Sequence, residues 1–324
     1  MEYRKHIYAV ILIGLLSAPL FYIFPSASNV TLYLRALAGA PETAIVGNSV
    51  IRAVSKCDKD KRSLVGLLRS GNSSILDMSF GGQSIEYTAN MAALVAKNSN
   101  VKNIIIGLSM PSFSSFDNMP LRDLIFFGLS NPSLLNSTVR KRIEEKTGVF
   151  AGRMAFGQKS FEYKGTRYPS YEGLKYRYFI KEKEAMPCPE NDGYDMEFVE
   201  AYYHRVYSYD ITDRAVAENV ALLASLNSSI DSHSKRLTFV FMPVNHQLIE
   251  KMSPATVESI KHNSKAVAAL LEGQGIKTLD LSYMLPNEDF CDRWCACGHL
   301  CYTGRQKVAS RIYEYISENN DIGN

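Results

Sequence analysis

An excess of charge of one sign is what this sequence lacks. Its 36 basic and 33 acidic side chains leave a formal net charge of +3 over 324 residues, with no long run of one sign. Chains that bind nucleic acid concentrate lysine and arginine, so this balance gives no indication of such a partner. Internal repeats and low-complexity tracts are also absent, which argues against a repeat array or a disordered chain. With 46% hydrophobic residues, the chain can bury a substantial core.

Residues 1–28 are predicted to form a membrane anchor. Two basic residues precede an uncharged apolar stretch, residues 7–25, that is just long enough to cross a bilayer. The basic flank stays on the cytoplasmic side, so a single-pass anchor in the cytoplasmic (inner) membrane would place residues 29–324 in the periplasm or exterior. A cleaved signal peptide is the alternative, because residues 26–28 are small. The length of the apolar core favours the anchor.

Four of the six cysteines are crowded into residues 291–301, and Cys57 and Cys188 stand apart from them. The four are Cys291, Cys295, Cys297 and Cys301. Their C-x3-C-x-C-x3-C spacing differs from the paired C-x2-C motifs of structural zinc sites. Exported proteins oxidise their cysteines, so up to three disulfides are the favoured interpretation. A bound metal and free thiols are the alternatives, and the connectivity does not follow from the spacing.

Apolar runs alternate with amphipathic segments along most of the chain. Strands are predicted within residues 43–46, 73–82, 101–110, 236–244 and 276–284. Helices are predicted near residue 50 and within residues 84–98, 214–226, 259–274 and 303–319. This alternation predicts an α/β fold, a doubly wound parallel sheet covered by helices on both faces.

Residues 112–212 interrupt the alternation after the third strand. Ten of the nineteen tyrosines fall between Tyr163 and Tyr209, so the segment is too aromatic to be disordered. It is predicted to be a long insertion that packs as a lid beside the carboxyl ends of the strands. Its tyrosines suit two roles equally, stacking on sugar rings or ordinary packing within the lid.

Ser49 follows the first predicted strand, after Gly47 and Asn48. In a doubly wound sheet, ligands bind outside the carboxyl ends of the strands, so residues there are candidates for the site. A serine at a helix start lies beside free backbone N–H groups, which suits a nucleophile with an oxyanion site. The alternative is that Ser49 is only a helix N-cap, a common role for serine.

A nucleophilic serine needs a general base, and histidine is the usual one. His299 lies just before the last predicted helix, between Gly298 and Gly304 and beside the crowded cysteines. His246 follows the end of a predicted strand and is the competing candidate. A solvated loop histidine is the alternative for His299. A cysteine staple that positions His299 is favoured over a metal knot.

The order of these motifs resembles the SGNH-hydrolase superfamily, which has a flavodoxin-like sheet. Gly47-Asn48-Ser49 looks like its first block, usually Gly-Asp-Ser, and implies Ser49 as the nucleophile. The segment DMSFGGQS looks like the second block and implies that the amide of Gly82 is an oxyanion donor. IIIGLSM falls where the third block reads Gly-x-Asn-Asp. HLCYTGRQKVASRI resembles the last block and implies His299 as the catalytic base.

Within that superfamily the likeness is closer to DltD-type proteins and relatives from polysaccharide-acylation systems. The shared traits are one amino-terminal anchor, a long insertion after the third strand, an FMPVN-like strand end that includes Asn245, and a histidine-leucine pair before the last helix. Asn245 is therefore a candidate for contacting substrate. The resemblance spans most of residues 1–320 through short motifs.

Two departures from the superfamily pattern affect the site. Ser109 stands in place of the third-block asparagine, so that oxyanion donor would be a hydroxyl. The last block usually reads Asp-x-x-His, but Ala296 stands three residues before His299. Asp292 is the nearest upstream acid and completes a Ser-His-Asp triad only if paired cysteines fold the loop back. Otherwise the site is a Ser-His dyad.

The resemblance implies a cell-envelope O-acyltransferase or esterase that transfers or removes acetyl or D-alanyl groups on a polysaccharide or teichoic-acid-like polymer. It implies a multi-pass membrane-bound O-acyltransferase as the acyl donor. No cofactor and no metal are expected. The missing Asp-x-x-His spacing favours an alternative, a non-catalytic accessory protein that binds the glycan or the partner of an acylation complex.

Overall fold

The computed structural model describes the core of the predicted domain. The described residues are 36, 40–54, 58–71, 74–79, 84–114, 161–168, 196–207, 211, 214–291, 293 and 298–320. Outside them lie the predicted anchor and most of the predicted insertion, and also Gly82, Asp292, Cys57, Cys188, Cys295 and Cys297. Within the described part, no helix is both long enough and apolar enough to span a bilayer.

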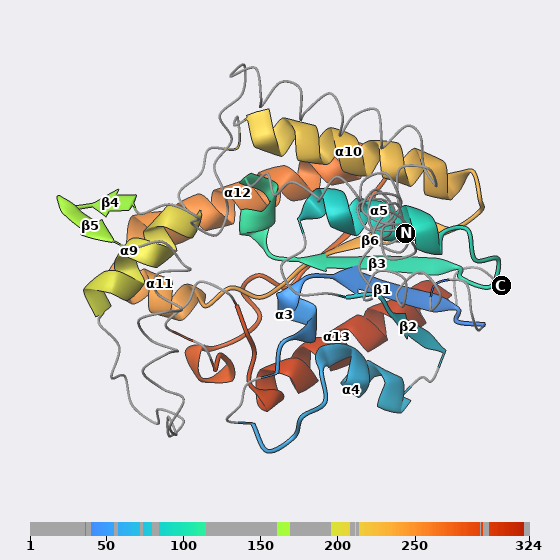
Figure 1. Ribbon diagram of the computed structural model, residues 1–324, viewed down its shortest axis with the longest axis horizontal. Helices are drawn as coiled ribbons and strands as arrows, with labels where there is room; N and C mark the ends of the chain where they lie inside the picture. Colours follow the sequence, from blue (N-terminus) through green and yellow to red (C-terminus); the bar gives the residue numbers. More distant parts are fainter. Residues whose placement is uncertain are drawn as a thin grey trace, which may run out of the picture.

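Five strands form one parallel sheet (Figure 1). They are β1 (Thr43–Gly47), β2 (Ile75–Asp77), β3 (Asn103–Leu108), β6 (Arg236–Phe241) and β7 (Lys277–Asp280). Their order across the sheet is β2-β1-β3-β6-β7. Counted along the chain this is the 2-1-3-4-5 order of flavodoxin-like sheets. The predicted doubly wound parallel sheet is therefore confirmed: four of its strands lie inside predicted segments, and β1 extends one residue beyond its own, to Gly47.

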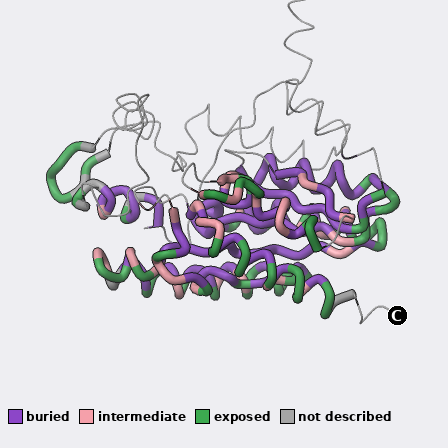
Figure 2. The backbone as a smooth tube through the Cα atoms, turned by 90° about the horizontal axis from the view of Figure 1, so that it is seen from below, coloured by how far each residue is buried: buried purple, intermediate pink, exposed green. Residues whose placement is uncertain are grey.

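Helices cover both faces of this sheet (Figure 1). On one face lie α5 (Ile85–Val95), α10 (Arg214–Asp231) and α12 (Pro254–Glu272); on the other lie α3 (Ser49–Arg52), α4 (Leu64–Gly71) and α13 (Tyr302–Asn320). Each layer encloses its own cluster of buried apolar side chains. The three inner strands β1, β3 and β6 are buried along most of their length (Figure 2), as expected for a sheet covered on both faces.

Several elements carry no clear sequence signal. They are α4, α9 (Met196–Tyr207), α11 (His246–Met252), the antiparallel hairpin β4 (Phe161–Tyr163) and β5 (Thr166–Tyr168), and the short 3-10 turns η1 (Met110–Ser114) and η3 (Asn287–Asp289). In α9, Tyr202, Tyr203 and Tyr207 are each no more than 3% exposed and share a core with residues of α11 and α12. Packing is thus the role of these three tyrosines of the predicted lid.

A pair of glycines lets α3 begin directly at the end of the sheet. Gly47 and Gly107 are opposite each other in the register of β1 and β3. A Cβ on Gly47 would lie 2.4 Å from the carbonyl oxygen of Gly107, and a Cβ on Gly107 would lie 2.5 Å from Cδ1 of Ile51. No side chain fits in that space. The two glycines therefore admit Ile51 against the sheet and fix the position of the residue that starts α3, Ser49.

Candidate active site

Ser49 and Ser109 lie at the point where the strand order reverses. β1 has β2 on one side and β3 on the other. The connection after β1 runs over the face that carries α3 and α4, whereas α10, in the connection after β3, covers the opposite face (Figure 1). Ser49 follows β1 by two residues, and Ser109 follows β3 directly. The register pairs Gly47 with Gly107, which brings these two serines to the same edge of the sheet. In open α/β sheets, this switch point is where ligands bind.

The N-cap of α3 is Asn48, not Ser49. The side-chain oxygen of Asn48 accepts a hydrogen bond of 3.1 Å from the backbone N–H of Val50. Ser49 is the first helical residue and is half-buried. Among the described residues its hydroxyl has no hydrogen-bond partner, His299 included. Capping therefore does not explain Ser49, and its hydroxyl remains available for chemistry.

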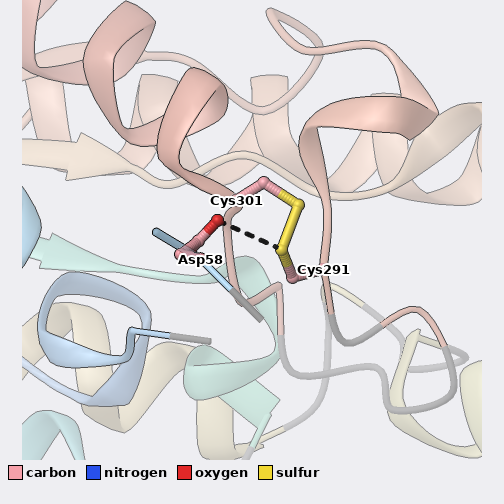
Figure 3. Close-up of side chains that lie close together, drawn as sticks. All are labelled: Asp58, Cys291 and Cys301. Carbon is pink, nitrogen blue, oxygen red and sulfur yellow. Dashed lines mark hydrogen bonds between the residues drawn. A yellow bond between two sulfur atoms is a disulfide. The ribbon is translucent and has the colours of Figure 1, made fainter. Parts of the chain in front are cut away.

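His299 lies on a cross-linked hairpin before α13. Phe290 and Leu300 form an antiparallel bridge, and the backbone N–H of Cys291 donates to the carbonyl oxygen of His299 at 3.1 Å. Cys291 and Cys301 form a disulfide (Figure 3). The predicted staple beside His299 is confirmed for these two cysteines. The ring nitrogen Nε2 of His299 is shielded from solvent.

The hairpin packs against the start of α3. A Cβ on Gly298 would lie 3.2 Å from the carbonyl oxygen of Pro243 and 4.0 Å from Cγ1 of Val50. Gly298 also has φ = +66°, a conformation that glycine adopts without strain. The neighbour of His299 therefore lies close to the neighbour of Ser49, with the chain that follows β6 on its other side. This contact brings the two parts of the chain that carry the predicted nucleophile and base to one edge of the sheet.

A buried ion pair supports the hairpin from behind. Arg305 of α13 is 1% exposed, and its Nη1 lies 2.6 Å from Oδ2 of Asp58. The same guanidinium donates to the backbone carbonyl oxygens of Arg62, Leu300 and Asp60 at 2.8–3.0 Å. Oδ1 of Asp58 accepts from the backbone N–H of Tyr302 at 3.1 Å. Sequence reasoning missed this pair, because nothing in the spacing of residues 58 and 305 relates them.

Asp58 also lies next to the disulfide. Its carboxylate and the sulfurs of Cys291 and Cys301 fall within 4.8 Å of one another (Figure 3). As thiolates, the two cysteines and the aspartate would offer three metal ligands. A disulfide sulfur carries no negative charge, and Arg305 already neutralises Asp58. The oxidised cluster is therefore suited to fixing the hairpin rather than to holding a cation.

Among the described residues, the acid that directly precedes the hairpin in sequence is Asp289, and it is engaged by α13. Asp289 is 2% exposed. Its Oδ1 accepts from the Thr303 hydroxyl and its Oδ2 pairs with Lys307 Nζ, both at 2.6 Å. Asp289 therefore anchors the first turns of α13, and each of its carboxylate oxygens already has a partner on that helix. Asp292, the predicted triad acid, lies outside the described residues, as does Gly82, a predicted oxyanion donor.

The two other predicted contact residues, Ser109 and Asn245, differ in the hydrogen bonds that they make within the protein. Ser109 is 6% exposed and directly follows β3. Its backbone carbonyl oxygen accepts a hydrogen bond of 3.0 Å from Ser112 N–H, and this bond does not involve the side-chain hydroxyl. Asn245 caps α11, because its Oδ1 accepts from Leu248 N–H at 3.2 Å, and its Nδ2 donates to Asn287 at 2.8 Å. Both ends of the Asn245 amide thus hold the protein together before any substrate arrives.

His246, the competing base, begins α11 at the end of β6. Its ring packs edge-on against Tyr283, with 5.5 Å between ring centroids. Burial raises the pKa of the Tyr283 hydroxyl above its usual value, so this tyrosine stays neutral near pH 7. His246 therefore faces an aromatic wall on the β7 side, whereas the His299 hairpin faces α3.

Neither a protein-family model nor a curated protein matches the chain. Solved structures do show similarity. A lipase/acylhydrolase from Enterococcus faecalis is 9% identical, with coverage of 86% of this chain and 96% of that one and a TM-score of 0.38. An acetylxylan esterase from Geobacillus stearothermophilus is 10% identical, with 86% and 95% covered and a TM-score of 0.40. An extracellular lipase from Streptomyces rimosus is 11% identical, with 81% and 86% covered and a TM-score of 0.35.

Proposed function

We propose that this chain is an SGNH-type serine acyltransferase or esterase that acts on acyl esters of a cell-envelope polymer. The observation that carries the proposal is the closeness of Gly298 to Val50, whose Cγ1 would lie 4.0 Å from a Cβ on that glycine, because it places the His299 hairpin beside the helix that begins with Ser49. Asn48 caps that helix, so the Ser49 hydroxyl is not needed for structure. A serine and a histidine on adjoining segments at a sheet switch point suit acyl transfer.

In the proposed reaction, Ser49 Oγ attacks the carbonyl carbon of an acyl ester and gives its proton to His299. The negative charge that develops on the carbonyl oxygen is stabilised by the backbone N–H of Ser49, by the amide of Gly82 and by the Ser109 hydroxyl. His299 then returns the proton to the leaving alkoxide, which departs as an alcohol and leaves an acyl ester on Ser49. Asp292 orients the imidazole if the loop brings it within reach.

The second half of the reaction regenerates the serine. A hydroxyl group gives its proton to His299 and attacks the acyl-serine, and His299 protonates Ser49 as the ester bond breaks. If the hydroxyl belongs to water, the protein is an esterase; if it belongs to a sugar, the protein is a transferase. We propose a membrane-anchored, DltD-like role, with a multi-pass membrane-bound O-acyltransferase as donor and an envelope polysaccharide or teichoic-acid-like polymer as acceptor.

The test is the formation of an acyl-enzyme on Ser49. The full chain is incubated with p-nitrophenyl acetate and quenched in acid, and the intact mass and the modified peptide are measured. We expect an added acetyl group on Ser49, lost in Ser49→Ala and His299→Ala and retained in Ser317→Ala, an exposed serine of α13. The Ser49→Ala/His299→Ala variant should hydrolyse p-nitrophenyl acetate no more slowly than either single variant, because the effects of residues that act as one catalytic unit are not additive.

A binding-only accessory protein is the second candidate. It is favoured by the absence, within the described residues, of a hydrogen bond between the Ser49 hydroxyl and His299. Catalytic hydrogen bonds often form only when the substrate is bound, so this geometry is compatible with both functions. Polymer acylation in cells that carry Ser49→Ala at matched protein level separates them. Wild-type acylation with that variant would end the catalytic proposal.

A further inference from the structure

A groove outside the candidate active site runs between α4 and α13. It has a volume of about 490 Å³, within the range of about 300–1,000 Å³ that small-molecule sites occupy. Neither Ser49, Ser109, Asn245 nor His299 lines it. The two helices lie side by side beneath the sheet (Figure 1). The groove is therefore a separate surface on the same side of the sheet as α3.

One face of α13 supplies most of the groove. Tyr302, Gln306, Ser310 and Tyr313 line it, and residues three to four apart lie on the same face of a helix. From Tyr302 to Tyr313 this face extends about 16 Å. Tyr302 stands three residues after His299, so one end of the groove begins beside the hairpin and the other lies away from it.

The aromatic walls of the groove are accessible. Tyr313 is 43% exposed, one of few large hydrophobic side chains in the described structure with so much contact to solvent. Gly71, the last residue of α4, faces it: a Cβ on Gly71 would lie 3.6 Å from Cε2 of Tyr313. Because Gly71 has no side chain, the Tyr313 ring keeps one side open. An open, rigid aromatic face is a surface on which a flat apolar ring can stack.

A row of hydrogen-bonded polar side chains lines the end of the groove nearer the hairpin. Arg62 is held by Asp60 through Nε and Nη2, and its Nη2 also donates to the Tyr302 hydroxyl at 3.2 Å. Gln306 donates to the same hydroxyl at 2.7 Å. A tyrosine oxygen accepts two hydrogen bonds and donates one. The Tyr302 hydroxyl can therefore still donate its own proton. The two N–H groups on Nη1 of Arg62 are not used by Asp60 or Tyr302.

The charges of the groove are paired internally. Arg62 and Glu314 are its charged lining residues. Asp60 neutralises Arg62, and the Arg62 hydrogen bond lowers the pKa of Asp60 to about 2, so this acid stays ionised at neutral pH. Arg311 pairs with Glu314 at 3.1 Å. The groove therefore offers aligned hydrogen bonds and aromatic faces without net charge, which suits neither a polyanion nor a purely apolar ligand.

We propose that this groove binds a neutral carbohydrate chain. Pyranose rings combine an apolar face, which fits Tyr313, with a rim of hydroxyl groups, which fits the donors of Arg62, Tyr302 and Gln306. The two N–H groups on Nη1 of Arg62, which Asp60 and Tyr302 do not use, can each donate to a sugar hydroxyl. The groove would hold a segment of polymer at a distance from the reacting ester. Such a site favours a polysaccharide over an anionic teichoic-acid-like chain as the polymer.

The test measures binding rather than catalysis. The full chain, purified in a detergent without a sugar headgroup, is titrated by calorimetry with xylohexaose, cellohexaose and chitohexaose at up to millimolar concentration. We expect at least one of these to bind. Tyr313→Ala removes the stacking face and Gly71→Leu fills the space beside it, so each should weaken binding about tenfold or more.

Two controls keep the result specific to the groove. Leu270→Ala, a change at a comparably exposed residue of α12 on the opposite face, should leave the affinity unchanged. Ser49→Ala should also bind normally, so the groove can stand even if the proposed catalysis fails, and the converse. The groove proposal is overturned if none of the three oligosaccharides binds, or if Tyr313→Ala and Gly71→Leu both bind them as the wild type does. Absence of binding would leave a protein helix as the better fit to this surface.

Discussion

Arg305 and Asp58 are 247 residues apart in the sequence and form an ion pair of 2.6 Å with side chains only 1% and 9% exposed. The pair joins the first turn of α13 to the segment between α3 and α4. Because Asp58 also accepts from Tyr302 N–H, and Arg305 donates to the carbonyl oxygen of Leu300, the pair encloses the base of the His299 hairpin. The geometry of that hairpin therefore depends on residues that do not touch the reacting atoms.

Breaking this pair should be costly. Arg305→Met leaves the Asp58 carboxylate buried and uncompensated, which costs about 3–5 kcal/mol in the free energy of unfolding. Arg311→Met, in the same helix, breaks an exposed pair with Glu314 and should cost less than about 1 kcal/mol. Urea unfolding of the two variants measures the difference.

Adding Asp58→Asn to Arg305→Met should recover part of the loss, because the second change removes the uncompensated charge. Recovery should be incomplete, since the backbone carbonyl oxygens of Asp60, Arg62 and Leu300 still lack the donors of Arg305. Equal losses in Arg305→Met and Arg311→Met would show that the buried pair contributes no more than a surface one.

The disulfide should stabilise the fold and hold the hairpin. Cys291 and Cys301 are 10 residues apart, and closing a loop of that size in the unfolded chain is worth about 3 kcal/mol. The Cys291→Ser/Cys301→Ser variant should lose about that much and should acylate Ser49 more slowly. Unfolding midpoints measured with and without reductant check it: reductant should lower the wild-type midpoint by more than that of the variant, in which only the other four cysteines can be reduced. A wild-type midpoint insensitive to full reduction would contradict the prediction.

The sheet could be predicted from the sequence because its signal is local. Each strand is a short apolar run followed or preceded by helical spacing, so β3 falls inside its predicted segment and β1 exceeds its own by one residue. The same holds for Ser49, whose choice as the candidate nucleophile follows from its place after a strand. Helix α4 was not predicted, because its eight residues include two glycines and form too short an amphipathic pattern.

The supports of the site could not be predicted, since they join residues that no local pattern relates. Asp58 looks like one acid among many in a polar stretch, and its burial appears only when α13 packs over it. Asn48 and Asn245 show the same limit: both follow strands as Ser49 does, but packing and capping assign them structural work. Sequence position thus finds the edge of the sheet, and three-dimensional contacts decide which side chains there remain available.

Tyr207 should make the protein sensitive to alkali. Burial raises the pKa of its hydroxyl well above the usual value of 10. Above pH 10 the unfolded chain loses this proton while the folded chain keeps it, so the free energy of unfolding falls as pH rises toward the folded pKa. Tyr207→Phe should remove this part of the fall, and Tyr313→Phe, at an exposed position, should not. Unfolding curves between pH 9 and 11, followed by circular dichroism, make the comparison; parallel pH profiles for wild type and Tyr207→Phe would count against it.

Gly298 offers the sharpest separation of stability from activity. Gly298 and Gly275 both have positive φ, +66° and +75°, so alanine at either position costs about 1–2 kcal/mol of backbone strain. Gly275 lies in the turn before β7, where a Cβ would meet only Asn227 Nδ2 at 3.5 Å. At Gly298 a Cβ would lie 3.2 Å from the carbonyl oxygen of Pro243, a tight contact, so alanine there must also shift the hairpin relative to the end of β6.

The two alanine variants should therefore lose similar stability but differ in chemistry. Gly275→Ala should form the acetyl adduct on Ser49 at the wild-type rate, whereas Gly298→Ala should be slower. The loss should stay below the roughly 100-fold that misplacing a catalytic group by about 1 Å costs, because the tight contact with Pro243 requires a smaller shift. Adduct formation with p-nitrophenyl acetate, measured at a temperature where both variants are folded, gives the ratio. If the two variants react equally fast, the fit of Gly298 beside Pro243 and Val50 does not set the position of a catalytic His299. The base must then be sought elsewhere, and His246 is the first candidate.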